Sequence, residues 1–214
     1  MLSNIANKVT PQSAALLVMD IQNDFCEDGG YFGRLGRDMK PLQEMVSRLE
    51  TLIDASRELE VPIFFIKAIY DDIYLSESTR LRHERNNLPQ NYCISGTWGA
   101  EFYKIKPLPN EIVINKHRYS SFTGTNLDSL LRASGIETVI CTGTATNVCV
   151  EATAREAYSK DYHVVMVEDC CSTSYGEDFH EMTLENCRKT FGVVCNSEEL
   201  IGHLANYEVD SPYK

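Results

Sequence analysis

Positive charge is scarce in this 214-residue chain, in which 20 lysines and arginines face 31 aspartates and glutamates for a formal net charge of −11. A field of that sign repels phosphate backbones, so nucleic acid is not expected as a partner. Long apolar runs are also lacking. None approaches the roughly 18 residues that a membrane-spanning helix needs, so no membrane partner is expected either.

Targeting and disulfide patterns are missing as well. Residues 1–10 lack the basic patch and long apolar stretch of a secretory signal, which predicts a cytoplasmic protein. The eight cysteines include no Cys-x-x-Cys pair and have no regular spacing, which disfavours a disulfide framework and a thiolate metal site. We expect most of them to be small buried hydrophobes. The chain length fits one domain, over residues 1–214.

Apolar runs alternate with helical patterns along most of the chain. Strands are predicted at 14–19, 61–66, 111–114, 138–143, 164–167 and 192–195, and helices at about 38–59, from 125 to Gly135, 147–159 and 177–190, the last of which is the final helix. Thr125 with Asp128 is the predicted cap of the second helix. Residues from about 70 to 110 read as a long excursion with short helices. The prediction is a three-layer α/β/α doubly wound domain with a mostly parallel sheet of about six strands.

Polar residues follow three of these strands directly. Asp20 ends the first apolar run, Lys116 follows the third, and a small-residue loop from Thr144 to Cys149 follows the fourth. In doubly wound folds, ligands bind beyond the carboxyl ends of the strands, near the point where strand order reverses. These three segments therefore aim their side chains at one edge of the sheet.

Each of the three residues has two interpretations when taken alone. Cys149 is either a thiol activated by the positive end of a helix or a buried cysteine. Asp20 is either a general base that later returns its proton or a cap of the following turn. Lys116 is either a partner for a thiolate or a lysine that extends to solvent. Together they suit nucleophilic attack by a thiol.

Three motifs in order resemble the isochorismatase-like cysteine hydrolase superfamily: Asp20-Ile21-Gln22-Asn23-Asp24-Phe25, Lys116-His117-Arg118-Tyr119-Ser120-Ser121-Phe122 and Gly143-Thr144-Ala145-Thr146-Asn147-Val148-Cys149-Val150. The likeness covers roughly residues 13 to 202. The superfamily includes amidohydrolases of non-peptide C–N bonds, such as nicotinamidases and N-carbamoylsarcosine, biuret and ureidoacrylate hydrolases.

The resemblance implies a catalytic triad and a covalent mechanism. Cys149 would be the nucleophile, Asp20 its base and then the leaving-group acid, and Lys116 their electrostatic partner. A non-proline cis peptide would join Thr144 and Ala145, and the N–H groups of Ala145 and Cys149 would face the oxyanion. Water would then hydrolyse the thioester. Because relatives without this cysteine act on vinyl ethers, the presence of Cys149 disfavours that chemistry.

The resemblance also points to one branch of the superfamily. Metal-dependent nicotinamidases carry an Asp-x-His pair after the second strand, whereas residues 67–72 hold no histidine and His83 is the only one before His117. No metal or cofactor is therefore expected. Gly29-Gly30-Tyr31 and Gly96-Thr97-Trp98 look like the ureido-cleaving branch, closest to the ureidoacrylate hydrolases, which release ammonia and a carbamate. A metal-free nicotinamidase-like amidase and a biuret hydrolase are the alternatives.

Candidates for substrate binding follow from residue type and position. The aromatic ones, each of which could equally pack in the core, are Phe25, Trp98, Tyr119 and Phe122. Gln22 or Asn87 could bond a ureido group, and Arg118 could clamp a carboxylate or remain solvated.

Three further alternatives stay open. His117 could replace Asp20 as the base of the cysteine, although adjacent residues of an extended segment point to opposite faces. Glu151 and Arg155 are predicted as an i, i+4 ion pair on a helix. A non-enzymatic domain that senses redox state through Cys149 is the rival from another class. By analogy with the superfamily, the chain is expected to form a dimer or tetramer.

Overall fold

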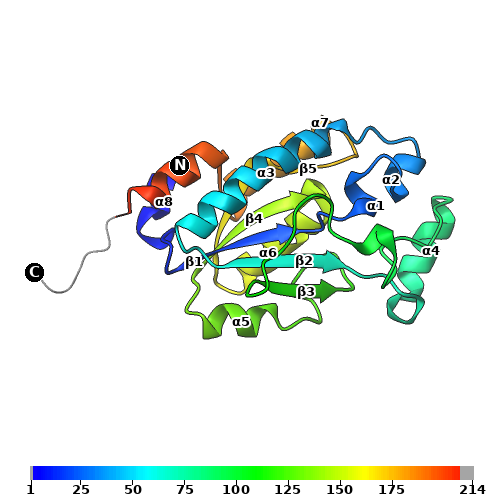
Figure 1. Ribbon diagram of the computed structural model, residues 1–214, viewed down its shortest axis with the longest axis horizontal. Helices are drawn as coiled ribbons and strands as arrows, with labels where there is room; N and C mark the ends of the chain where they lie inside the picture. Colours follow the sequence, from blue (N-terminus) through cyan, green and yellow to red (C-terminus); the bar gives the residue numbers. More distant parts are fainter. Residues whose placement is uncertain (1, 208–214) are drawn as a thin grey trace, which may run out of the picture.

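The computed structural model describes residues 2–207 and contains a six-stranded parallel sheet in the order β3-β2-β1-β4-β5-β6 (Figure 1). The strands are β1 (Ala14–Met19), β2 (Ile63–Ala68), β3 (Ile112–Lys116), β4 (Thr138–Thr144), β5 (His163–Ser172) and β6 (Val193–Cys195). The chain runs outward from β1 to β3 and then returns to β4 on the other side of β1. Strand order therefore reverses between β1 and β4, where doubly wound folds bind ligands.

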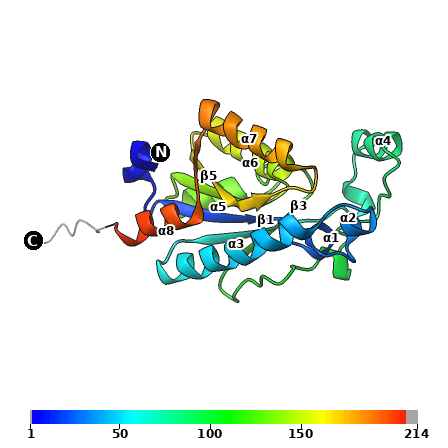
Figure 2. The same cartoon turned by 90° about the horizontal axis from the view of Figure 1, so that it is seen from above.

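Helices cover both faces of this sheet (Figure 2). One face packs against α3 (Lys40–Glu58) and α8 (Ser197–Ala205), and the other against α5 (Leu127–Ala133), α6 (Glu151–Ser159) and α7 (Glu177–Thr190). The two helix layers explain why all six residues of β1 are buried, because a strand covered on both faces must be apolar throughout. The predicted α/β/α doubly wound class is confirmed.

The remaining short elements gather near the carboxyl ends of the strands (Figure 1). They are α1 (Asn23–Cys26), α2 (Tyr31–Arg34), α4 (Glu77–Arg85) and 3₁₀ turns at Asp72–Tyr74 and Trp98–Ala100, and a further 3₁₀ segment, Leu2–Lys8, precedes β1. Part of this region forms an aromatic cluster of its own, in which Tyr31, Tyr70 and Tyr92 are buried and Phe25 and Phe32 pack against them. The segment after β1 and the excursion after β2 thus build an aromatic wall together near the carboxyl ends of the strands.

Some predicted boundaries are wrong. The helix expected from residue 147 begins instead as a π-helical turn, Thr146–Val150, and only then becomes α6. Thr125 does not cap α5, whose N-cap is Asn126, although the Thr125 hydroxyl accepts a hydrogen bond from the Leu127 N–H at 3.2 Å. The helix at 177–190 is not the last, because α8 follows β6.

Gly143 in β4 lies against the backbone of β1 and gives a stability prediction. Its φ is +109°, and a Cβ built there would stand 2.1 Å from the Met19 carbonyl oxygen. Gly143→Ala should lower the free energy of unfolding in urea by more than about 2 kcal/mol, because both the conformation and the contact oppose a side chain. Gly202→Ala is the matched control, since nothing lies within 4 Å of its Cβ; a similar loss in both variants would contradict the account.

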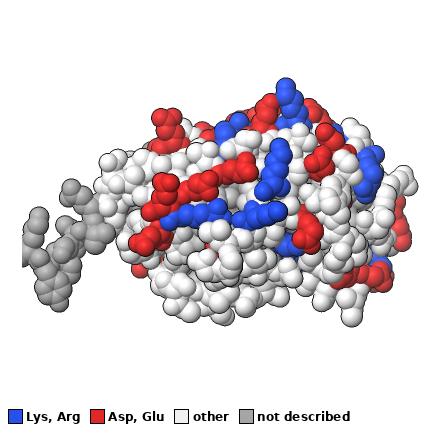
Figure 3. Space-filling view, in the orientation of Figure 1, with Lys and Arg blue, Asp and Glu red and all other residues white. Residues whose placement is uncertain are grey.

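Charged side chains of both signs lie side by side over the α3 side of the molecule (Figure 3). The pairs there include Lys40 with Glu44 at 3.7 Å and Arg57 with Glu111 at 2.8 Å. The negative charge is therefore interleaved with positive charge on this side. Among residues 2–207, no helix combines the length and apolar character needed to cross a bilayer.

Candidate active site

Asp20, Lys116 and Cys149 come together although 129 positions separate the first from the last. The Lys116 Nζ lies 2.9 Å from Asp20 Oδ2 and 3.3 Å from Cys149 Sγ. Asp20 and Lys116 are 0% exposed and Cys149 is 5% exposed. The structure thus brings a thiol, an ammonium and a carboxylate into one buried contact.

The ends of three strands position these side chains. Asp20 directly follows β1 in the left-handed region, with φ +57°, a conformation that aspartate tolerates better than most residues. Its N–H donates to the Ile66 carbonyl at 2.9 Å, which fixes the turn against β2. Lys116 ends β3 opposite Ala68 of β2, and Cys149 lies in the π-helical turn after β4. The lysine therefore reaches its partners across the end of β2.

The Cys149 turn is held from two sides. The Val150 N–H donates to the Ala145 carbonyl at 3.2 Å, and the Thr153 hydroxyl donates to the Cys149 carbonyl at 2.7 Å. The peptide bond between Thr144 and Ala145 is cis, as the superfamily resemblance implies. Ala145 and Cys149 are both part of the pocket lining.

Burial controls the protonation of the cysteine. Burial raises the pKa of the Cys149 thiol to about 12; Lys116 acts to lower it and Asp20 to raise it. The sequence left two interpretations of Cys149 open, a thiol activated by a helix end and a buried cysteine, and the raised pKa agrees with the second. Burial acts to lower the pKa of Lys116, but Asp20 and then Cys149 outweigh it and hold that pKa above its usual value. At neutral pH the pair is a thiol beside an ammonium, and a base must remove the thiol proton.

This raised pKa predicts how Cys149 reacts with iodoacetamide. Because only the thiolate reacts and the pKa is about 12, the alkylation rate should rise roughly tenfold per pH unit from about pH 7 to pH 10. Mass spectrometry of the Cys149 peptide measures this rate, with N-acetylcysteine as the control thiol that levels off near its own pKa. An alkylation rate of Cys149 that reaches a plateau below about pH 9 would show that the pKa of the thiol is not raised.

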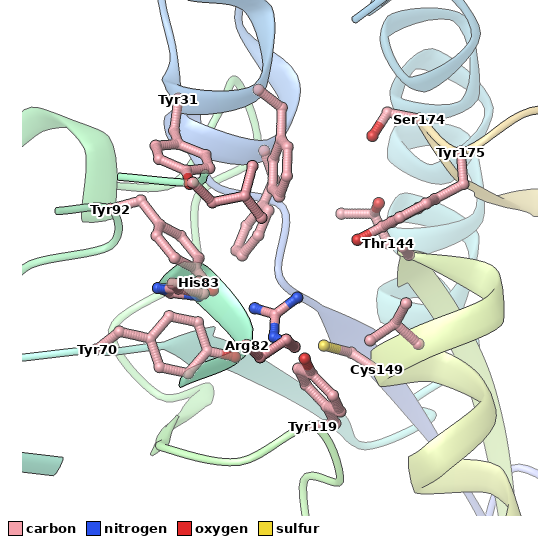
Figure 4. Close-up of a pocket in the computed structure, with 15 residues that line it drawn as sticks. Tyr31, Tyr70, Arg82, His83, Tyr92, Tyr119, Thr144, Cys149, Ser174 and Tyr175 are labelled. Carbon is pink, nitrogen blue, oxygen red and sulfur yellow. The ribbon is translucent and has the colours of Figure 1, made fainter. Parts of the chain in front are cut away.

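The thiol opens into a pocket of about 580 Å³, open mouth included, at the carboxyl end of the sheet (Figure 4). Its walls are mainly aromatic, with α4 on one side and the turn after β4 on the other. The lining residues are Phe25, Tyr31, Phe32, Tyr70, Arg82, His83, Leu88, Tyr92, Tyr119, Thr144, Ala145, Val148, Cys149, Ser174 and Tyr175. Mainly aromatic walls with a few polar groups are typical of sites that bind a small molecule.

Two of the predicted substrate-binding residues, Phe25 and Tyr119, line this pocket. Trp98 is 54% exposed and Asn87 is also exposed, and neither is part of the lining. Phe122 is buried in the core, where its ring lies 5.8 Å from that of Tyr162. The structure thus puts these three predicted residues outside the cavity.

Gln22 and Arg118 are occupied by backbone contacts. The buried Gln22 amide donates to the carbonyls of Ala68 and Ala100 and accepts from the Ala68 N–H at 2.7 Å, so it fastens the excursion to β2. Arg118 is exposed and donates to the carbonyls of Tyr74 and His117. Both side chains therefore hold backbone in place, and neither belongs to the pocket lining.

Most of the pocket wall was missed by sequence reasoning. Tyr31, Tyr70 and Tyr92 are each 6% exposed or less, and the Tyr31 and Tyr92 rings stack with centroids 4.5 Å apart. Arg82 and His83 enter from α4, which has almost no apolar stripe to mark it as a packed helix. The available signal was the tyrosines and the Arg82-His83 pair within the excursion, because long loops often carry binding residues.

His117 and the Glu151–Arg155 pair lie away from the thiol's contacts. The His117 Nδ1 lies 2.8 Å from the Ile69 carbonyl oxygen, and its ring stacks on Tyr74 at 3.6 Å between centroids. His117 is not part of the pocket lining, which disfavours it as the base. The predicted ion pair is confirmed, with Arg155 Nη2 2.9 Å from Glu151 Oε1.

One group in the described part of the chain brings three potential metal donors within 4.8 Å of one another: Glu177, His180 and Glu181 on α7. Both glutamates are exposed, and His180 Nδ1 already lies 2.9 Å from the Thr146 hydroxyl oxygen. None of the three lines the thiol pocket. Exposed acidic groups of this kind are common without an ion, so the absence of a metal remains a prediction.

A family model described as the isochorismatase domain matches residues 14–199. Ureidoacrylate amidohydrolase RutB of Pantoea ananatis is 34% identical over 173 residues, which are 75% of this chain and 69% of that protein. Ureidoacrylate amidohydrolase RutB of Agrobacterium fabrum is 32% identical over 205 residues, 90% of each chain.

Three solved structures also resemble this chain, each at 26% sequence identity. A cysteine hydrolase from Pseudomonas syringae pv. phaseolicola superposes with a TM-score of 0.78 over 90% of this chain and 92% of that one. N-carbamoylsarcosine amidase from Thermoplasma acidophilum gives 0.71 over 87% and 97%. Nicotinamidase PncA from Bacillus subtilis gives 0.73 over 86% and 99%.

Proposed function

The chain belongs to the isochorismatase family, and from this premise we propose that it is an amidohydrolase that cleaves the C–N bond of a small ureido compound through Cys149, Asp20 and Lys116. The observation that carries the proposal is the buried contact in which Lys116 Nζ lies 2.9 Å from Asp20 and 3.3 Å from the Cys149 sulfur. The ureidoacrylate amidohydrolases among the relatives support the substrate class.

The first half of the reaction forms a thioester. Asp20 takes the proton of the Cys149 thiol, which is needed because that pKa is about 12, and Lys116 stabilises the thiolate as it forms. The sulfur attacks the ureido carbon, and the N–H groups of Ala145 and Cys149 receive the oxyanion. The C–N bond then breaks, and Asp20 returns the proton to the departing nitrogen, which leaves as ammonia.

The second half regenerates the enzyme. Water attacks the thioester carbon, Asp20 accepts a proton from that water, and the sulfur departs and recovers a proton. The product is a carbamate, which decays to carbon dioxide and an amine. No metal or cofactor is needed for either half, because the chain supplies the nucleophile, the acid–base group and the cation.

Nicotinamidase-like amidase activity is the second candidate, and the likeness to nicotinamidase PncA favours it. This candidate uses the same three residues as the ureido hydrolase and differs from it only in the bond that is cleaved. Biuret hydrolysis likewise differs only in the substrate. The redox-sensing alternative is disfavoured. All eight cysteines are buried, and burial raises the pKa of Cys149, whereas redox sensors use accessible thiols of low pKa. We expect a homodimer or homotetramer, which gel filtration with light scattering would measure.

Ammonia release from a substrate panel tests the proposal. The panel holds ureidoacrylate or a stable analogue, biuret, N-carbamoylsarcosine, nicotinamide and simple amides, with Cys149→Ala as the blank and EDTA as a metal control. We expect turnover of a ureido compound that is lost in the blank and unchanged by EDTA. Turnover of nicotinamide alone would select the second candidate, and equal release with and without Cys149 would refute the proposal.

A further inference from the structure

Arg82 is the one cationic side chain in the pocket lining, and it lies on α4 far in sequence from the proposed triad. Figure 4 shows its guanidinium in the middle of the cavity, between the Cys149 sulfur and the tyrosine wall. Tyr119 lies beside it, with the guanidinium carbon 5.9 Å from the ring centroid. Arg82 is therefore placed where a molecule attacked by Cys149 would have to sit.

This cation has no anionic partner among residues 2–207. No hydrogen bond or ion pair joins its side chain to another described residue, and its buried Nε has no acceptor. The pocket lining contains no aspartate or glutamate. By contrast, Arg57 pairs with Glu111 and Arg188 with Glu168. A partly buried charge without a partner is costly. The pocket therefore favours a ligand that brings an anionic group to Arg82.

The positive charge of Arg82 affects the pKa of three tyrosines that line the pocket. Burial raises the pKa of Tyr31, Tyr92 and Tyr119, and in each case the Arg82 cation is the largest influence in the opposite direction. A second arginine, Arg37, lies near the Ser174 and Tyr175 side of the pocket, where it donates to the Ser174 hydroxyl at 2.9 Å. The cavity is thus electropositive in a protein whose net charge is −11.

We propose that Arg82 binds a carboxylate of the substrate, so that the enzyme acts on ureido acids and not on neutral ureas. The inference rests on the proposed function, because the carboxylate belongs to the molecule whose C–N bond Cys149 attacks. A guanidinium presents paired N–H donors that match a carboxylate bidentately. The aromatic walls suit the flat ureido part between the two ends. Arg82 takes the role that the sequence suggested for Arg118.

Turnover of a matched substrate pair measures this preference. We compare β-ureidopropionate with hydroxypropylurea, its neutral counterpart. Both are tested on the wild type, Arg82→Gln, Arg82→Lys and Arg85→Gln. Arg85→Gln is the control, because it removes an exposed charge from the same helix. Arg82→Gln should lower kcat/KM for the acid about 10- to 100-fold and change that for the urea less than about threefold. Arg82→Lys should recover part of the loss, and Arg85→Gln should match the wild type.

Equal losses on both compounds in Arg82→Gln would overturn the proposal, as would a wild type that prefers the neutral urea. The neutral compound also serves as the folding control, because a variant that misfolds loses both activities. An effect of Arg85→Gln as large as that of Arg82→Gln would likewise overturn it, since it would reduce the effect to the general charge of α4.

Alkylation of Cys149 tests the anion site without any turnover. Iodoacetate carries a carboxylate and iodoacetamide does not, and peptide mass spectrometry reports both rates at Cys149. Arg82→Gln should slow iodoacetate about tenfold relative to iodoacetamide, whereas Arg85→Gln should leave the ratio unchanged. An unchanged ratio in Arg82→Gln would overturn the anion site. A changed ratio in an enzyme that cleaves no ureido compound would instead refute the proposed function and keep the site.

Discussion

Cys149→Ala is expected to lower kcat/KM for the ureido substrate about 10⁴-fold or more, because it removes the atom that forms the covalent intermediate. The fold should persist. The replaced side chain is small, and Asp20 still has Lys116 at 2.9 Å as its ion-pair partner, so the free energy of unfolding should change by no more than about 1–2 kcal/mol. Ammonia release and urea denaturation measure the two effects.

Cys195→Ala is the matched control for this variant. Cys195 is buried at 2% exposure in β6 and does not line the pocket, so its loss should cost a similar amount of stability and leave kcat/KM within about twofold. Activity within tenfold of the wild type in Cys149→Ala would show that the thiol is not the nucleophile.

Lys116→Met is expected to cost about 3–5 kcal/mol of unfolding free energy and to remove most activity. Asp20 is completely buried, and Lys116 is its ion-pair partner in the described part of the chain, so the variant leaves a buried charge without compensation. Asp20→Asn should have a comparable cost, because the buried Lys116 ammonium then loses the carboxylate and has neutral acceptors, such as the Arg118 carbonyl and the Cys149 thiol. Urea denaturation measures both.

The double variant Asp20→Asn/Lys116→Met separates pairing from packing. Because each single change leaves a charge that the double change removes, the double variant should be more stable than the sum of the single effects predicts, by at least about 2 kcal/mol. Lys40→Met, at an exposed pair with Glu44, should cost less than about 0.5 kcal/mol. Additive losses in the double variant would contradict the coupling between Asp20 and Lys116.

The sheet could be predicted from sequence because its signal is local. The apolar run before Asp20 ends abruptly, as do those before Lys116 and Gly143, and parallel strands bring such ends to one edge. The π-helical turn at Cys149 could not be predicted in this way, since it depends on contacts with other elements, such as that between Thr146 and His180. The pKa of the Cys149 thiol depends on tertiary packing in the same way, because burial is the largest cause of its increase and the sequence left the burial of this residue open.

The pocket walls had no comparable signal. Gln22 looked like a substrate ligand by residue type, yet both ends of its amide bind backbone of β2 and the excursion. Arg118 is the candidate carboxylate ligand in the sequence, whereas the arginine that lines the pocket is Arg82 on α4. Residues 70–110 lack periodicity, so which of their side chains face the thiol follows from tertiary packing.

Mass spectrometry of the enzyme, quenched in acid during turnover of a ureido acid, tests the thiol mechanism most directly. The account predicts an adduct on the peptide that contains Cys149, equal in mass to the substrate less ammonia, present in the wild type and absent in Cys149→Ala. An adduct of a carbamoyl group alone would keep the thiol mechanism and reverse which nitrogen leaves first. Turnover at full rate with no adduct on Cys149, under quench conditions that preserve a synthetic thioester, would contradict the covalent mechanism.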